Sequence, residues 1–365
     1  MRIAFYAPLK HPDHPVPSGD RQIARLLIAA LRRAGHEVTL ASRLCLYDGA
    51  GDPERQRLLA ARAARTAERL VRRWRAEPAP DLWFTYHLYY KAPDHLGPAV
   101  CDALGIPYVV AEASLAGKRA IGPWGESHRA VEHALRRADA VIGLNSADRA
   151  GVLPALADPG RWVTLAPFID TRAYRAGARV AGPARLIAVA MMRPGDKLAS
   201  YQVLGTSLTR LLDLDWVLEV VGDGLARDEV AAALAPLGGR VTWRGALPSP
   251  QVAARLAEAD ICVWPAINEA FGLALVEAQA SGLPVVAGNS GGVGDIVADG
   301  TTGMLVPAGD AEAFAEAVRG LILDPGRRAA MGATARDKAL REHDIGAAAD
   351  RLGAVIAALG RARAA

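Results

Sequence analysis

The feature that most constrains this chain is a regular alternation of short β-rich runs with helical patterns, which restarts once near residue 184. Such alternation is typical of parallel sheets with crossover helices. In the first part we expect strands at Ile3–Ala7, Val38–Ala41, Leu82–Thr85, Tyr108–Ala111, Ala140–Leu144 and Trp162–Leu165. In the second part we expect strands at Arg185–Ala190, Trp216–Val221, Val241–Trp243, Ile261–Trp264, Val285–Ala287 and Gly303–Leu305.

The length of 365 residues exceeds the usual size of one domain. We therefore predict an α/β protein with two Rossmann-like, doubly wound domains that face a central cleft. The predicted divisions are an N-terminal domain over 1–170, a linker over 171–184, a C-terminal domain over 185–342, and a last helix within 343–365 that packs on either domain. Ligands of such sheets bind beyond the carboxyl ends of the strands.

The composition excludes several classes of protein. Hydrophobic residues make up 51% of the chain, which argues against disorder, yet no apolar run reaches the ~18–20 residues of a membrane helix. Cys45, Cys101 and Cys262 are far apart and odd in number. They indicate core thiols in a reducing compartment rather than disulfides or a zinc site, so we expect a cytoplasmic protein.

The segment that carries most chemical information runs from Asn268 to Ala287. It predicts a strand end, a loop with Glu269, and a helix that begins near Phe271-Gly272. Unpaired amides and the helix dipole make such a helix start a seat for a diphosphate, lined by Ala270, Phe271, Gly272 and Leu273. Glu277 lies about one and a half turns further along, so it can reach a ribose while Glu269 reaches a sugar.

Glu269 and Glu277, separated by seven residues, match the E-x7-E motif, and the segment resembles family 4 of the retaining glycosyltransferases. The similarity continues through Gly291–Val306 and covers most of residues 185–340. The resemblance implies the GT-B fold, a nucleotide diphosphate sugar as donor, retention of anomeric configuration, and no need for a metal or other cofactor. Without that context, both Glu residues would be interpreted as solvated charges at helix ends.

Three other stretches of the second half match the same family. Arg193 and Lys197 occupy the positions of a cation pair that holds the donor phosphates, although ordinary loop charges are the alternative. Gly222 and Asp223 resemble the family's turn beside the nucleotide. The segment from Arg244 to Leu247 corresponds to the place where backbone atoms hold the base.

In the first half the match is less complete. Gly19 corresponds to the first glycine of a family loop, but Asp20 replaces the second. Asp20 either faces the acceptor or caps the first helix. Related enzymes place a His after the strand that ends near Ala111, whereas this chain has Glu112. Candidate contacts to acceptor or sugar are therefore Asp20, His87, Glu112, Ser114 and Lys118, although a lone His such as His87 more often serves in packing.

The segment from Glu54 to Arg75 contains eight Arg and two Glu, and a helical wheel separates an apolar face from a basic one. The basic face is formed by Arg62, Arg65, Arg69, Arg72 and Arg73. It is either a solvated surface or a platform for an anionic membrane or an acidic acceptor, and nucleic acid is not expected as a partner.

These patterns predict a glycosyltransferase that moves a sugar to a glycan, a lipid-linked molecule or a small molecule. Two alternatives stay open: an inactive protein that binds nucleotide sugars, and an epimerase or hydrolase on the same fold. A dinucleotide-dependent dehydrogenase is disfavoured because the first βα turn lacks G-x-G-x-x-G.

Overall fold

The computed structural model describes residues 1–16, 18–177 and 182–364, and its contacts divide the chain into two compact units. Unit 1 consists of Met1–Leu165 and Ile345–Ala365, and unit 2 consists of Ala166–Asp344. The division after Leu165 lies a few residues before the predicted boundary at 170. The predicted linker over 171–184 falls within unit 2, and its residues 178–181 lie outside the described part of the chain.

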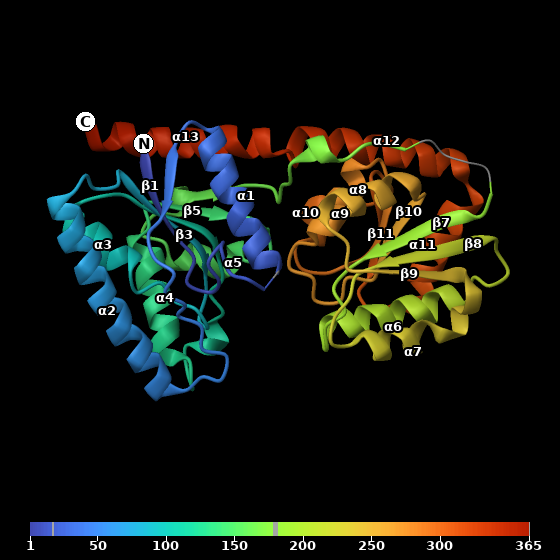
Figure 1. Ribbon diagram of the computed structural model, residues 1–365, viewed down its shortest axis with the longest axis horizontal. Coiled ribbons are helices and arrows are strands. Elements are labelled where there is room, and N and C mark those ends of the chain that lie inside the picture. Colours follow the sequence, from blue (N-terminus) through green and yellow to red (C-terminus); the bar gives the residue numbers. More distant parts are fainter. Residues whose placement is uncertain (17, 178–181, 365) are drawn as a thin grey trace. The chain divides into compact units, whose positions relative to one another are not determined.

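Unit 1 contains one parallel sheet of six strands in the order β2-β1-β3-β4-β5-β6 (Figure 1). The strands are β1 Arg2–Tyr6, β2 Glu37–Leu40, β3 Leu82–Leu88, β4 Tyr108–Ala113, β5 Ala140–Gly143 and β6 Trp162–Thr164. All six predicted strands are confirmed. The predicted ends of β3 and β4 were wrong, because both strands continue by two or three residues and thereby include His87 and Glu112.

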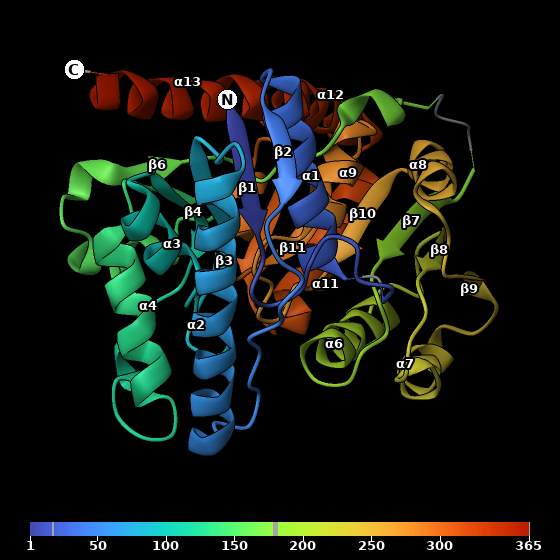
Figure 2. The same cartoon turned by 60° about the vertical axis from the view of Figure 1, so that its left-hand side comes forward.

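The helices of unit 1 cover both faces of this sheet (Figures 1 and 2). They are α1 Gly19–Arg33, α2 Pro53–Ala76, α3 Gly97–Leu104, α4 Gly125–Arg137, α5 Arg149–Val152 and α13 Ile345–Ala364, with 3-10 turns η1 Gly117–Arg119, η2 Leu153–Ala155 and η3 Pro159–Arg161. Ala63 of α2, Val100 of α3 and Val131 of α4 are buried against Tyr6 and Trp83. The last helix, α13, packs against α1.

Unit 2 contains a second parallel sheet in the order β12-β11-β10-β7-β8-β9. Its strands are β7 Ala184–Val189, β8 Trp216–Val221, β9 Val241–Gly245, β10 Ile261–Trp264, β11 Val285–Asn289 and β12 Gly303–Pro307. Its helices are α6 Asp196–Thr209, α7 Arg227–Leu234, α8 Ser249–Glu258, α9 Leu273–Ala280, α10 Val293–Ile296, α11 Ala311–Leu323 and α12 Pro325–Glu342, with turns η4 Thr171–Ala173 and η5 Ala235–Arg240. The predicted fold class, α/β with two doubly wound sheets, is confirmed.

A buried histidine joins the two ends of unit 2. The His343 ring donates to the Pro167 carbonyl over 2.6 Å and lies 2.7 Å from the Lys338 ammonium. Burial, together with that ammonium, lowers the pKa of His343 to about 4. The neutral ring therefore fixes the point at which the chain enters and leaves this unit.

The strand orders decide where each unit can bind a ligand. In unit 1 the order reverses between β1 and β3, and in unit 2 it reverses between β7 and β10. Connections leave a doubly wound sheet in opposite directions at such a point, which opens a crevice at the carboxyl ends of the strands. Within the described residues, no helix combines the length and the apolar character needed to cross a bilayer.

Candidate functional site

The reversal point of unit 2 brings together two residues that the sequence singled out separately. Lys197 lies in the first turn of α6, just after β7, and Glu269 lies in the loop after β10. The Lys197 ammonium and the Glu269 carboxylate form an ion pair. Their side chains are 27% and 14% exposed, so the pair is shielded from water while ligands can still reach it.

Trp264, the last residue of β10, completes this cluster. Its indole nitrogen donates to the same Glu269 oxygen over 3.0 Å, and the Lys197 ammonium lies 5.2 Å from the centre of its ring. The indole thus holds the carboxylate by a hydrogen bond and the ammonium by a cation–π contact. Sequence analysis missed Trp264, although its place at the end of a strand at the reversal point was available as a signal.

The loop between Trp264 and Glu269 has an unusual backbone. Ala266 and Asn268 have φ angles of 54° and 48°, in the left-handed region that side chains rarely adopt. Asn268 donates to Asp196 over 2.9 Å, and the Ile267 amide donates to Ser200 over 3.0 Å. Both contacts attach the loop to the first turns of α6. Strained conformations persist where surrounding contacts impose them, and they cluster at functional sites.

The helix after this loop presents the expected amide tip. Helix α9 begins at Leu273, slightly later than predicted, and Gly272 before it has a φ of 76° and offers no side-chain cap. A Cβ at Gly291 would lie 2.1 Å from the Glu269 carbonyl, so glycine allows the loop after β11 to approach. Ala270 is exposed and Phe271 is buried. The Leu275 amide donates to the Gly272 carbonyl over 2.8 Å, and no side chain caps the start of α9, which is where the sequence predicts a phosphate seat.

Glu277 lies on α9 and is partly buried. Burial raises its pKa from 4.5 to about 7, against the opposing effect of a hydrogen bond with Tyr174. Tyr174 directly follows η4 at the start of unit 2 and was not predicted from the sequence. A carboxyl group whose protonation changes near neutral pH is typical of a binding site.

The remaining predicted residues of unit 2 lie on loops at the same edge or beside it. Arg193 is exposed on the loop between β7 and α6. Gly222, with a φ of 148°, follows β8, and a Cβ there would lie 1.8 Å from the Ala190 carbonyl. The glycine is therefore needed for two neighbouring loops to pack. Asp223 pairs with Arg227 at 3.4 Å.

The segment expected to hold the base makes a side-chain contact that the sequence did not indicate. Arg244 is in β9, and its guanidinium donates to Glu219 of β8 over 2.9 Å. Leu247 is partly exposed on the loop that follows.

In unit 1 the corresponding edge brings together Asp20, His87 and Glu112. The His87 ring lies 2.9 Å from the Asp20 carboxylate. Burial lowers the pKa of His87, but Glu112 and Asp20 outweigh it and raise the pKa overall. Burial raises the pKa of Glu112 to about 7. His87 and Glu112 have φ angles of 63° and 58°, so left-handed residues mark this edge as they mark the edge of unit 2.

The capping interpretation of Asp20 was wrong. Ser18 is the N-cap of α1 and accepts a hydrogen bond from the Arg21 amide over 3.2 Å, which leaves the Asp20 carboxylate free to hold His87. Gly19 is the first residue of α1. The buried Tyr86 hydroxyl, close to Glu112, is a further polar group that the sequence did not indicate.

Within the part of the chain that the structure describes, the two other predicted contacts of unit 1 form no hydrogen bond or ion pair with Asp20, His87 or Glu112. Ser114 follows β4 and is half-buried, and its amide donates to the Leu88 carbonyl over 3.0 Å. Lys118 is exposed in η1. Among the described residues, no three His, Cys, Asp or Glu side chains form a group that could hold a metal ion.

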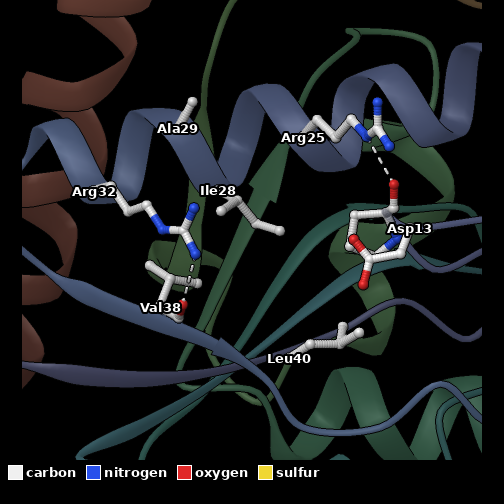
Figure 3. Close-up of a pocket in the computed structure, with 8 residues that line it drawn as sticks. Asp13, Arg25, Ile28, Ala29, Arg32, Val38 and Leu40 are labelled. Atoms are coloured by element: carbon white, nitrogen blue, oxygen red, sulfur yellow. Dashed lines mark hydrogen bonds between the residues drawn. The ribbon is translucent and has the colours of Figure 1, made fainter.

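A hollow of about 530 Å³ lies between α1 and β2 and contains none of the predicted residues (Figure 3). Its arginines serve the fold: Arg25 donates to the Pro12 carbonyl over 2.7 Å, and Arg32 donates to the Val38 carbonyl over 3.0 Å. We assign this hollow no part in the site.

Comparison with known proteins shows the family of the chain. Residues 199–338 match the family described as glycosyl transferases group 1. The D-inositol 3-phosphate glycosyltransferase 1 of Catenulispora acidiphila is 32% identical over 285 residues, which cover 70% of this chain and 68% of the relative. The chain belongs to the group 1 glycosyltransferases. A D-inositol 3-phosphate glycosyltransferase of Rhodococcus jostii is 31% identical over 304 residues, 73% of this chain and 64% of the relative.

The match spans 64–66% of the length of the first three curated relatives. Solved structures extend the likeness of fold to nearly the whole chain. A sucrose-phosphate synthase from Thermosynechococcus elongatus has a TM-score of 0.76 at 20% identity and covers 99% of both chains. HepE of Anabaena, in complex with UDP, has a TM-score of 0.76 at 18% identity and covers 98% of this chain and all of its own.

The raised pKa of Glu277 predicts how stability depends on pH in this glycosyltransferase family member. Because the pKa of Glu277 in the folded state lies above 4.5, the folded protein binds this proton more tightly than the unfolded chain does. The free energy of unfolding that comes from this proton is full below pH 4.5 and is lost as the pH rises through 7. Glutamine resembles the neutral acid at every pH. As the pH rises from 5 to 8, we expect the unfolding free energy of Glu277→Gln to increase relative to that of the wild type by on the order of 2 kcal/mol. Denaturant titrations at both pH values measure this.

The exposed Glu229 of α7 provides the matched control for that measurement. Glu229→Gln should change the unfolding free energy equally at the two pH values. If the difference in unfolding free energy between Glu277→Gln and wild type is also the same at both pH values, burial does not disfavour the Glu277 carboxylate.

Proposed function

We propose that this protein transfers a sugar from a nucleoside diphosphate sugar to an acceptor, with the donor held at the reversal point of unit 2. The observation that carries the proposal is the cluster of Lys197, Glu269 and Trp264 beside the open amide tip of α9. It provides a cation, a carboxylate and backbone donors within one small region. Those are the groups needed to hold a diphosphate and a sugar together.

Positive charge is required because transfer leaves a nucleoside diphosphate with increased negative charge. In the proposal, Lys197 and Arg193 stabilise that charge together with the amides around Phe271 and Leu273. Lys197 is already held by Glu269 and Trp264, so little rearrangement is needed when the donor arrives. The HepE structures in complex with UDP and with UDP-glucose support a nucleotide sugar of this kind.

The two carboxylates have separate roles in the proposal. One Glu269 oxygen accepts from both Lys197 and Trp264, and a carboxylate has further acceptor positions for sugar hydroxyls. Glu277 accepts from the ribose. Gly222 and Asp223 lie beside the nucleotide, and the backbone from Arg244 to Leu247 holds the base.

The acceptor is assigned to unit 1, where Asp20, His87 and Glu112 offer hydrogen-bond partners to hydroxyl groups and Ser114 and Lys118 extend the contact surface. We further propose membership of family 4, retention of anomeric configuration, and no requirement for a metal ion. In that mechanism the leaving phosphate accepts the proton of the acceptor hydroxyl on the same face of the sugar.

Substitutions at the ion pair test the proposal through two measurable quantities. Glu269→Gln should lower donor turnover at least 100-fold while the affinity for UDP or GDP changes little, because Glu269 contacts the sugar. Lys197→Met should weaken nucleotide binding about 10-fold or more, because the cation is lost and Glu269 then repels the phosphates. Release of UDP or GDP from a panel of nucleotide sugars measures the turnover, and calorimetry measures the nucleotide affinity.

The double variant sharpens this test. Lys197→Met combined with Glu269→Gln should recover part of the lost nucleotide affinity, because the repelling carboxylate is gone. Arg255→Met on α8, whose guanidinium pairs with Glu258 and not with Lys197, Glu269 or Trp264, is the control and should behave as wild type. Full turnover by Glu269→Gln would refute the role given to Glu269.

We also propose that α2 contacts an anionic membrane surface. Leu59, Ala63, Ala67, Leu70 and Trp74 pack inward as the wheel predicts. Arg62, Arg65, Arg69 and Arg72 line a hollow of about 530 Å³ beside Ser42 and Leu44. Arg73 instead pairs with Glu77 over 2.7 Å. A row of basic side chains on one helix face suits phosphate headgroups, each gaining about 1 kcal/mol near such a surface.

Replacement of those four lining arginines by Gln should reduce cosedimentation with phosphatidylglycerol vesicles at least 10-fold at low salt, and high salt should reduce wild-type binding similarly. Replacement of Arg129, Arg136, Arg328 and Arg341, on other helices, controls for net charge. Equal binding by both quadruple variants and wild type would show that the basic face is merely solvated.

A further inference from the structure

A group of two cations and two aromatic rings lies on the loops of unit 1 and has no part in the roles assigned so far. Tyr90 and Lys91 follow β3, Arg119 is in η1 after β4, and Trp124 immediately precedes α4. The two rings lie 5.3 Å apart at 81°. Because these loops follow the carboxyl ends of β3 and β4, the group lies at the edge where this unit is expected to bind ligands.

Both cations approach both rings. The Arg119 guanidinium carbon lies 5.1 Å from the centre of the Tyr90 ring and 5.0 Å from that of Trp124. The Lys91 ammonium lies 5.9 Å and 5.8 Å from the same two centres. All four side chains are half-buried. The rings therefore hold two like charges near each other, an arrangement that repels itself unless a negative group balances it.

No carboxylate of this chain supplies that balance in the part that the structure describes, where neither Lys91 nor Arg119 forms an ion pair. Asp48, whose amide donates to the Lys91 carbonyl, has its carboxylate engaged by the amides of Ala50 and Asp52 and by the side chain of Gln56. Neither cation therefore has a carboxylate of the described residues within ion-pair distance, which leaves both able to pair with an anion from outside.

Two buried donors in the group also lack partners. The Arg119 Nε and the Trp124 Nε1 are inaccessible to solvent, and neither has a hydrogen-bond partner among the described residues. Buried donors are nearly always satisfied in folded proteins, so an orphaned donor beside an unbalanced cation indicates a missing acceptor atom. An oxyanion supplies several acceptor oxygens on one centre and forms charge-assisted hydrogen bonds with such donors.

A row of rings connects this group with the polar residues expected to bind the acceptor. The Tyr89 ring lies 5.6 Å from Tyr90 and 4.7 Å from the His87 ring, and His87 contacts Asp20. A molecule lying along this row would place hydroxyl groups near His87 and an anionic group near Lys91 and Arg119.

We propose that Tyr90, Lys91, Arg119 and Trp124 form a subsite for an anionic group, a phosphate monoester or a carboxylate, carried by the sugar-like or polyol acceptor. This assignment rests on the proposed glycosyltransferase function, which defines the acceptor. The two cations balance the charge of the group, the two orphaned donors bind its oxygens once the half-buried Arg119 and Trp124 side chains turn toward it, and the ring faces contact the apolar side of the carbon skeleton.

The test uses sn-glycerol 3-phosphate as the probe, with glycerol and inorganic phosphate for comparison, in the full chain. Saturating UDP is present so that the phosphate seat of unit 2 is occupied. Saturation-transfer NMR and phosphorus line broadening report binding. We expect the phosphate ester to bind at least 10-fold more tightly than glycerol, and the double variant Lys91→Met, Arg119→Met to lose that difference. Arg129→Met, an exposed cation of α4, should retain it.

Further variants keep the result interpretable. Trp124→Phe retains a ring but loses the donor, and we expect a loss of two- to fivefold in affinity with an unchanged thermal midpoint. The subsite is refuted if the double variant stays folded and binds the ester as wild type does. The acceptor assignment is refuted if inorganic phosphate binds as tightly as the ester. Titration with UDP alone reports the proposed function separately, so its failure is distinguishable from failure of the subsite.

Discussion

The ion pair between Lys197 and Glu269 is the interaction on which the functional account depends. Lys197 in the first turn of α6 and Glu269 in the loop after β10 are 72 positions apart, and they meet because β7 and β10 are neighbours at the point where the strand order reverses. Trp264 contacts both partners from the end of β10. A cation held in this way is positioned before any substrate arrives, and preorganisation of charge is the main means by which such sites act.

Both units use the same structural device at their carboxyl edges. All four non-glycine residues with positive φ among those described, His87, Glu112, Ala266 and Asn268, lie at or just after the ends of strands β3, β4 and β10. The sheets are rigid and well buried, so they can impose these conformations on short segments. At His87, Glu112 and Asn268 the result is a polar side chain whose direction is fixed by the local backbone.

Much of this could be predicted from the sequence, because alternating apolar runs specify parallel strands directly. The six strands of each sheet and the helix α2 appear where the pattern placed them, within a few residues at the ends. Glu269 and the tip of α9 were also predicted, since a shared motif preserves their spacing, and Lys197 was predicted from a second stretch that matches the same family. The resemblance covered the second half of the chain best, and there Lys197 and Glu269, predicted from separate stretches, form an ion pair.

The remaining features depend on tertiary contacts that no local pattern records. The pairing of Asp20 with His87 joins residues 67 positions apart, and Ser18 rather than Asp20 caps α1. The extension of β3 and β4 through His87 and Glu112 was missed because polar residues in left-handed conformations do not resemble strand residues. The contacts of Arg119 and Lys91 with Tyr90 and Trp124 arise from three separate segments.

Hydrogen exchange measured with and without UDP tests the central claim most directly, because it reports on each loop separately. If the donor binds at the reversal point of unit 2, UDP will slow exchange in residues 191–198 and in residues 266–275 together. Tight binding of UDP with unchanged exchange in both segments, or with slowed exchange only in unit 1, would contradict the account.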